Sequence, residues 1–269
     1  MDKAPEELNQ LARQLKSFHI PGQPLILTNV YDACTARLIA SIPSTKAVAT
    51  ASYAIASSLG IDDENTMSLS DNLIGVCRVA TGLRNAGKAD ALPLSADLQD
   101  GYADPAEAVR QAIKIGVVGC NIEDVDNSVQ PPKLRTLEEA KSRIADAVRG
   151  AKEAGVPDFV VNARTDVLGF EGTIDDVVER GQAYLEAGAT TVFVWGAMKR
   201  VITEKEVKDM VRRLDGKLAV LAQGLTIEVL QQCGVSRISI GPTLLLKALK
   251  FLENEATAIL EGKQWSMGW

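Results

Sequence analysis

The stretch LPLSADLQDGYADP, residues 92–105, begins as a short apolar run and ends in a polar turn. Asp97 closes the apolar run, and Gln99 follows two residues later. A strand that is buried on both faces stays nearly apolar until it leaves the core. The stretch therefore predicts a buried parallel strand with acids at its carboxyl end. A helix should follow, with Asp104 as its N-cap and Pro105 as its first residue.

The same pattern recurs along the chain, where short apolar runs alternate with longer amphipathic ones. Several amphipathic runs begin with Thr and end in Gly, as capped helices do. About eight strands and eight helices without a linker predict a single (β/α)8 TIM barrel over residues 1–269. The rival, a doubly wound sheet, should carry G-x-G-x-x-G after its first strand, and TNVYDACTARL (28–38) lacks it. The expected strands are 25–29, 46–52, 92–97, 117–124, 158–166, 190–195, 218–223 and 236–241.

Composition argues against several classes of function. A net charge of -6 and the lack of a Lys/Arg-rich run disfavour a nucleic-acid partner. No apolar run reaches membrane-spanning length, and residues 1–20 are typical of an amphipathic helix and not of a signal peptide. Four scattered cysteines disfavour a zinc site and indicate a reduced, cytoplasmic protein. The single histidine, His19, precedes the first strand, which disfavours a Ser-His-Asp or Cys-His mechanism.

Polar residues gather at the carboxyl ends of neighbouring strands, where barrel enzymes carry their chemistry. Asp97 and Gln99 follow the third strand, Glu123 ends the fourth, and Arg164 ends the fifth. Neighbouring carboxylates repel each other, and a divalent cation that prefers oxygen ligands, Mg²⁺ or Mn²⁺, relieves that repulsion. An arginine beside such a metal suits a substrate carboxylate. The set predicts a site that holds a 2-oxo acid and stabilises its enolate.

Each of these residues also has a plain structural interpretation. Asp97 and Glu123 would serve as capping acids at strand–helix turns. Arg164 and Asp166 would form a structural ion pair, and Asp32 would cap the helix that follows it. The coincidence of such residues at successive strand ends favours the site.

The order of several motifs adds a resemblance. TNVYDACTARL, ATASYAIASSLGIDD, LPLSADLQDGYAD, GCNIED, NARTD, VFVWG and ISIGPTLL together resemble the isocitrate lyase/phosphoenolpyruvate mutase superfamily, and above all its short mutase-like branch. The resemblance spans residues 24–249. It implies a barrel whose C-terminal helix is exchanged between the subunits of a homodimer or homotetramer. It also implies Mg²⁺ and a small 2-oxo acid substrate.

The resemblance further implies roles for individual residues. Asp97 would be the acid closest to the metal, Glu123 would hold the metal through water, and Gln99 would complete the set. The expected catalytic residues are Arg164, Asp63 and Tyr53, and the expected substrate-binding residues are Ala51, Ser52, Tyr53, Arg164, Asn121 and Trp195.

Three features depart from the superfamily pattern. Gln99 stands where a second acid is usual, so metal binding should be weaker. The segment VDNSVQPPKLRTLEEA (125–140) lacks the Cys and His of the lyase loop, and Asn127 and Ser128 are candidates for the polar groups of the mutase loop. Trp195 stands where the mutases hold a histidine, which disfavours phosphonate chemistry.

These observations predict an Mg²⁺-dependent lyase-type enzyme for an oxaloacetate-like or 2-methylisocitrate-like acid. Decarboxylation requires the fewest catalytic groups from the protein, because the metal stabilises the electron pair that the departing carboxylate leaves behind. C–C cleavage needs a base, and Tyr53, Asp32 or a water are the candidates. One alternative is a catalytically idle or specialised homologue that binds a 2-oxo acid or a partner protein. A further alternative is a phosphonopyruvate or phosphoenolpyruvate mutase or hydrolase. The tail 242–269, which contains Trp265 and Trp269, is expected to pack on a neighbouring subunit.

Overall fold

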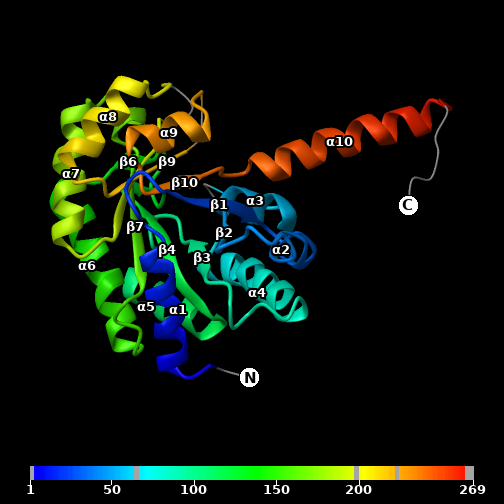
Figure 1. Cartoon of the computed structure of the whole chain (residues 1–269), viewed down its shortest axis with the longest axis horizontal. Helices are drawn as coiled ribbons and strands as arrows, with labels where there is room; N and C mark the ends of the chain where they lie inside the picture. Colours follow the sequence, from blue (N-terminus) through cyan, green and yellow to red (C-terminus); the bar gives the residue numbers. More distant parts are fainter. Residues whose placement is uncertain (1–2, 64–66, 197–199, 222–223, 264–269) are drawn as a thin grey trace.

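Eight parallel strands close into a barrel that helices surround (Figure 1). The computed structural model describes residues 3–63, 67–196, 200–221 and 224–263. Around the barrel the strands run in the order β1-β10-β9-β8-β7-β4-β3-β2. This confirms the predicted (β/α)8 fold. The barrel strands are β1 Leu25–Val30, β2 Val48–Thr50, β3 Leu94–Asp97, β4 Val117–Glu123, β7 Val160–Thr165, β8 Thr191–Val194, β9 Leu218–Leu221 and β10 Arg237–Ser239.

Capped helices return the chain from one strand to the next. The side chains of Thr136, Thr173 and Thr203 each accept a hydrogen bond from the amide three residues on, as N-caps do. Asp104 caps the helix that opens with Pro105, as predicted. The helices are α1 Pro5–Ser17, α2 Ala33–Ala40, α3 Ser52–Leu59, α4 Leu69–Asn85, α5 Pro105–Ile115, α6 Leu137–Glu153, α7 Ile174–Glu186, α8 Glu204–Arg213, α9 Ile227–Cys233 and α10 Thr243–Leu260.

The second strand ends earlier than predicted. The expected strand 46–52 stops at Thr50, Ala51 caps a helix, and Ser52 begins α3. The small residues of this segment fit either a strand or a helix, so the pattern gave no sign of the break. Two short elements were also not predicted: an antiparallel hairpin of β5 (Val125–Asp126) and β6 (Lys133–Leu134), and a 3-10 turn at Val167–Phe170.

The first helix packs against the side of the barrel away from the carboxyl ends of the strands. A Cβ atom on Gly119 of β4 would lie 2.7 Å from Leu15 Cδ2 and 3.0 Å from the carbonyl oxygen of Val160, so a glycine at this position favours the close approach. His19 follows the helix, and its Nδ1 lies 2.9 Å from the carbonyl oxygen of Leu15. Its Nε2 is buried without a partner among the described residues. Burial lowers the pKa of His19 to about 3, so the imidazole is neutral in the folded protein.

Acid should therefore destabilise the protein through His19. The unfolded chain binds a proton on this residue below about pH 6.5 and the folded chain does not, so stability falls as the pH drops below that value. From pH 7 to pH 5, we expect the wild type to lose about 2 kcal/mol more unfolding free energy than the His19→Gln variant. Urea unfolding at both pH values measures this difference. The same loss in both proteins would mean that His19 is protonated in the fold.

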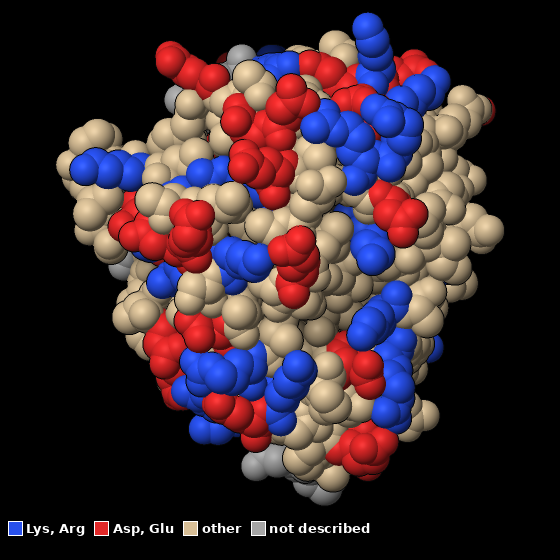
Figure 2. Space-filling view, turned by 90° about the vertical axis from the view of Figure 1, so that its left-hand side faces the viewer, with Lys and Arg blue, Asp and Glu red and all other residues tan. Residues whose placement is uncertain are grey.

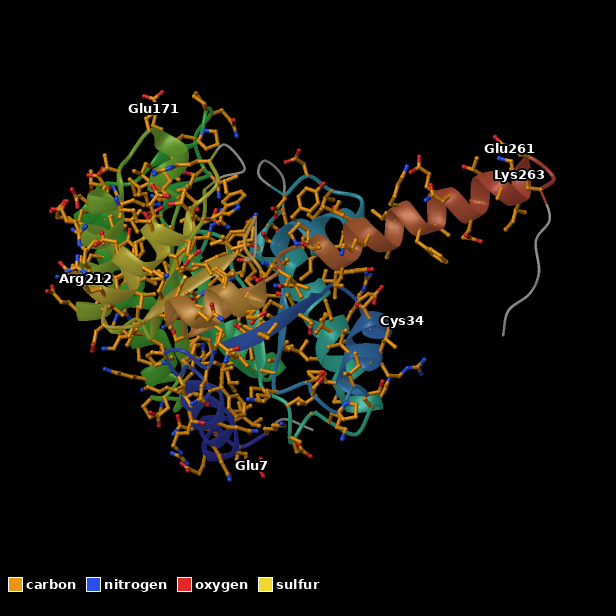
Figure 3. The ribbon with its side chains drawn as sticks, turned by 45° about the horizontal axis from the view of Figure 1, so that its top comes forward. Glu7, Cys34, Glu171, Arg212, Glu261 and Lys263 are labelled. Carbon is orange, nitrogen blue, oxygen red and sulfur yellow. The ribbon has the colours of Figure 1, made fainter. Side chains whose placement is uncertain are left out.

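The last helix stands away from the barrel (Figure 1). Leu245 is its one buried residue in the described part of the chain. Figure 3 shows side chains projecting along its length, with Glu261 and Lys263 at the end far from the barrel. Ile26 of β1 is 41% exposed. Large apolar side chains of α10 are also exposed: Leu246, Leu249, Phe251, Leu252, Ile259 and Leu260. The tryptophans of the tail, Trp265 and Trp269, lie outside the described residues.

The outer helices carry both signs of charge. Figure 2 shows basic and acidic side chains interspersed over the face that includes α6 and α7. Ion pairs such as Lys141 with Glu186 and Arg213 with Asp175 join neighbouring helices there. This face lacks the basic stripe that binds nucleic acid. Within the described residues, no helix combines the length and apolar character that a membrane span requires.

Candidate active site

Asp97 ends β3 at the mouth of the barrel, and among the described residues one of its carboxylate oxygens has no hydrogen-bond partner. The amide of Ser52 donates to Asp97 Oδ2 over 3.0 Å. The backbone of Asp97 is fixed by Thr50 Oγ1, which accepts from its amide, and by Asn72 Nδ2, which donates to its carbonyl. Asp97 Oδ1 is buried and has no partner among the described residues. A buried acceptor of this kind needs a cation or a donor.

Asp63 and Gln99 extend this network. Ser52 Oγ donates to one carboxylate oxygen of Asp63 over 3.2 Å, and Gln99 Nε2 donates to the other over 3.0 Å. Burial raises the pKa of Asp63 to about 6, and the charge of Asp97 adds to the effect. Gln99 has a left-handed φ of 50°, which is uncommon for a side chain with a Cβ. The turn after β3 holds this conformation and thereby aims the amide at Asp63.

Arg164 forms a second cluster with its neighbours. Its Nε and Nη2 donate to the two carboxylate oxygens of Asp166 over 2.7 and 2.6 Å. Its Nη1 lies 2.7 Å from Glu123 Oε2, and its guanidinium carbon lies 4.3 Å from the ring centre of Trp195. Burial alone would lower the pKa of Arg164, but the two carboxylates outweigh it and raise that pKa. The predicted ion pair of Arg164 with Asp166 is thus present, and Trp195 stacks on it.

Both carboxylate oxygens of Glu123 have partners. Arg164 contacts Oε2, and Asn127 Nδ2 donates to Oε1 over 2.8 Å. Burial raises the pKa of Glu123, and the charge of Arg164 opposes this effect. Asn127 belongs to the β5–β6 hairpin, so its amide brings the short loop after β4 into the site.

Buried ion pairs hold the root of the β5–β6 hairpin. Arg135 contacts Asp100 at 2.7 Å and Asp126 at 3.0 Å. Arg180 contacts Asp124 at 3.1 Å and donates to the carbonyl of Arg135. Asp100 therefore faces Arg135, and it does not replace the acid missing at position 99.

A ladder of hydrogen-bonded polar side chains lies in the barrel interior. Asn162 Nδ2 donates to Asn121 Oδ1 over 2.8 Å, and the Thr191 hydroxyl donates to Asn162 Oδ1 over 2.6 Å. Arg237 Nη2 also donates to Asn121 Oδ1, over 3.1 Å. Sequence reasoning missed Arg237, although a lone charge inside the expected strand 236–241 was a usable signal.

The structure brings most of the predicted residues into the two clusters and shows what the others contact. The Ser52 amide donates to Asp97 Oδ2. Asn121 directs its side-chain oxygen to the interior ladder. Ala51 is a buried helix cap, and Tyr53 is 48% exposed at the start of α3.

The residues at the mouth fit a hydrated Mg²⁺ ion better than an all-protein cage. The described part of the chain contains no group of three His, Cys, Asp or Glu residues arranged to hold a metal. Mg²⁺ keeps several waters and commonly takes only one or two carboxylates, and the unpaired Asp97 Oδ1 suits that role. If every group is ionised, two negative charges remain inside the barrel for a divalent cation to neutralise. The charged groups are Asp63, Asp97, Glu123, Asp166, Arg164 and Arg237.

Comparison with known proteins decides the family. A family model described as phosphoenolpyruvate phosphomutase matches residues 15–260. The chain belongs to the isocitrate lyase/phosphoenolpyruvate mutase superfamily. Among its superfamily relatives, 2-methylisocitrate lyase of Escherichia coli (strain K12) is 36% identical over 147 residues, which are 51% of this chain and 46% of the lyase. That match therefore spans about half the length of the lyase.

Solved structures of the superfamily share the fold. A protein of Burkholderia cenocepacia J2315, whose name proposes a phosphonomutase, has a TM-score of 0.81 and 32% identity, covering 95% of this chain and 99% of its own. Phosphonopyruvate hydrolase, solved with oxalate and Mg²⁺, has a TM-score of 0.78 and 22% identity, covering 94% of this chain and 88% of its own. At that identity, the second likeness shows the fold alone.

Proposed function

We propose that this protein is an Mg²⁺-dependent lyase-type enzyme that decarboxylates or cleaves a small 2-oxo acid through its enolate. The observation that carries the proposal is the unpaired, buried Asp97 Oδ1 at the mouth of the barrel, beside the Arg164 cluster. The family supports it, since the relatives include a C–C lyase and a hydrolase solved with Mg²⁺. The proposed substrates are an oxaloacetate-like 2-oxo acid, or a 2-methylisocitrate-like hydroxy acid whose C–C cleavage releases a 2-oxo acid and leaves the electron pair on the other fragment.

Asp97 would hold the metal directly, and Glu123 and Gln99 would hold it through water. Bound Mg²⁺, or Mn²⁺ in its place, supplies positive charge where the enolate oxygen becomes negative. Arg164 uses three of its five N–H donors on Asp166 and Glu123, which leaves two donors for a substrate carboxylate. Tyr53, at the exposed start of α3, would contact the rest of the substrate.

Asp63 is the proposed proton carrier. Its raised pKa of about 6 places its titration close to neutral pH, where a general acid or base works best. Hydrogen bonds from Ser52 and Gln99 hold its two oxygens in place. The hairpin that replaces the lyase loop offers the amide of Asn127 and neither a thiol nor an imidazole. This favours decarboxylation or simple C–C cleavage over a thiol-dependent mechanism.

A specialised homologue that binds a 2-oxo acid without turnover is the second candidate. Gln99 in place of an acid and the full occupation of both Glu123 oxygens favour it. Phosphonate chemistry is the weaker alternative, because Trp195 covers Arg164.

Product release from three acids tests these hypotheses together. Oxaloacetate, 2-methylisocitrate and phosphonopyruvate would each be incubated with the protein, with Mg²⁺ or with a chelator, and pyruvate would be measured by a coupled assay. We expect Mg²⁺-dependent pyruvate from one of the first two acids. Release from phosphonopyruvate would select the weaker alternative. If none of the three acids yields pyruvate, the result would favour the specialised homologue that binds a 2-oxo acid without turnover.

Restoring the acid at position 99 should strengthen the metal site. In the Gln99→Glu variant, we expect Mg²⁺ to bind about tenfold more tightly, because affinity follows the number of charged oxygen ligands. Without metal, the same variant should be less stable by about 1–2 kcal/mol, because Asp63 loses a donor and gains a negative neighbour. Calorimetric Mg²⁺ titration and urea unfolding measure the two effects. An unchanged Mg²⁺ affinity would place residue 99 outside the metal site.

We also propose that α10 packs on a second copy of the chain, in an exchanged homodimer or a homotetramer of the reduced, cytoplasmic protein. Phe251 is 68% exposed and Leu260 is 87% exposed, which a monomer rarely tolerates over so many apolar residues. The four cysteines of the chain are free thiols.

Light scattering tests the proposed assembly. The wild type should have at least twice the mass of one chain, and a Phe251→Glu, Leu252→Glu variant should shift towards the monomer. The matched control, Glu255→Lys on the same exposed helix, should keep the assembly. A monomeric wild type would contradict the proposal.

A further inference from the structure

A buried arginine crosses the barrel beneath the mouth. Arg237 begins β10, and 1% of its surface is exposed. Its Nη2 donates to Asn121 Oδ1 on β4, which lies four strands away and therefore on the opposite wall of the eight-stranded barrel. The side chain thus spans the interior. Asn121 pairs in register with Asp97, so the guanidinium reaches the level of the candidate metal ligand.

In the described part of the chain, no acid contacts Arg237 to match its charge. Among the described residues, Arg237 forms no ion pair, and its Nε and Nη1 have no hydrogen-bond partner. Burial lowers the pKa of Arg237 to about 10, which still leaves it protonated at neutral pH. The ionisable groups close enough to feel its charge include His19, Cys120 and Asp97, of which Asp97 is the acid. The positive charge of Arg237 therefore acts on Asp97 at the mouth of the barrel.

An unpaired buried charge weakens a fold, because it loses its hydration without gaining a counter-ion. A long aliphatic residue would fill the same space without that cost. The ladder of Asn121, Asn162 and Thr191 is complete without Arg237, since Asn162 already donates to Asn121. Neither packing nor hydrogen bonding thus requires a charged side chain at position 237. An electrostatic effect on the mouth would explain the charge.

We propose that Arg237 is a positioning residue that adapts the mouth to an anionic substrate. This inference rests on the proposed function. The four acids at the mouth are Asp63, Asp97, Glu123 and Asp166. With Mg²⁺ bound and every group ionised, these acids and Arg164 alone would give the mouth a net charge of -1, which repels a dianionic 2-oxo acid. The positive charge of Arg237 brings this net charge to zero. Its charge thereby favours the substrate anion and opposes Mg²⁺, and a low-dielectric interior transmits both effects.

The opposite signs of the two effects make the test specific. Calorimetry would give the dissociation constant of Mg²⁺ alone and that of oxalate at saturating Mg²⁺, for the wild type and three variants. Arg237→Met and Arg237→Gln remove the charge, and Arg237→Lys keeps it. For the neutral variants, we expect Mg²⁺ to bind several-fold more tightly and oxalate to bind about tenfold more weakly. Arg237→Lys should stay within about twofold of the wild type for both ligands, because it keeps the charge. Thermal unfolding should show no loss of stability in Arg237→Met.

The other outcomes overturn the inference. Unchanged constants in the neutral variants, weaker binding of both ligands, or a Lys variant as impaired as the Met variant would each show that the charge does not act on the mouth. If Arg237→Met fails to fold, Arg237→Gln carries the comparison, and failure of both variants to fold would show that the arginine is structural. A wild type that binds neither Mg²⁺ nor oxalate would overturn the proposed function, and this inference with it. A wild type that binds both, with variants that do not differ from it, would overturn this inference alone.

Discussion

Replacing Asp97 with asparagine should weaken Mg²⁺ binding by more than about a hundredfold and abolish turnover, because the variant loses a carboxylate whose buried Oδ1 has no partner among the described residues. The fold should survive, since the side-chain carbonyl of the introduced amide can still accept the hydrogen bond from the Ser52 backbone. Calorimetric Mg²⁺ titration and the pyruvate assay measure the loss, and circular dichroism checks the fold.

Asp100 provides the matched control for Asp97. It lies three residues away and is as deeply buried, but it faces Arg135 and Arg143 instead of the mouth. Asp100→Asn should therefore reduce stability and leave Mg²⁺ affinity within about twofold, because the Asp100 carboxylate pairs with Arg135 and Arg143. Equal Mg²⁺ affinity in wild type and Asp97→Asn would remove Asp97 from the metal site.

The Arg164→Gln variant should be destabilised by about 3–5 kcal/mol, because it leaves the buried carboxylates of Glu123 and Asp166 without a counter-ion. The same change should raise the concentration of oxalate needed for half-saturation, since it removes the two spare N–H donors. Urea unfolding and oxalate titration measure the two effects separately.

A second substitution separates the structural role of Arg164 in its ion pairs from its proposed role in binding the substrate carboxylate. In the double variant Arg164→Gln, Asp166→Asn, one of the two stranded charges is gone, so part of the lost stability should return. Oxalate binding should stay weak, because the donors are still missing. Recovery of oxalate affinity together with stability would mean that Arg164 serves only the structure. A fully stable single variant would contradict the buried ion-pair geometry.

The fold could be predicted because its signals are local. Strand ends in the sequence carry their own polar residues, and Thr136, Thr173 and Thr203 cap helices through contacts three residues away. The direction of α10 depends on how a whole helix meets the barrel, which periodicity does not encode. The switch from β2 to α3 at Ala51 depends on the acceptor that Asp97 offers to the Ser52 amide, a partner 45 residues away.

The proximity of the candidate residues was predictable, and their individual contacts were less so. Asp97, Glu123 and Arg164 were expected to lie together because polar residues at successive strand ends must meet at one mouth, and Glu123 and Arg164 are in contact in the structure. The sharing of Arg164 between Glu123 and Asp166 follows from three-dimensional geometry. Arg237 was missed because its side chain crosses the barrel to Asn121, 116 residues earlier in the chain.

Calorimetric titration of oxalate into the wild-type protein, with Mg²⁺ and with a chelator, tests the central claim most directly. Oxalate is a planar dianion that resembles the enolate of pyruvate. A metal bound at Asp97 and a carboxylate clamp at Arg164 should hold it together, so we expect binding with Mg²⁺ and none with the chelator. Oxalate binding of equal strength in both conditions, or no binding in either, would contradict a metal-dependent 2-oxo acid site at the barrel mouth.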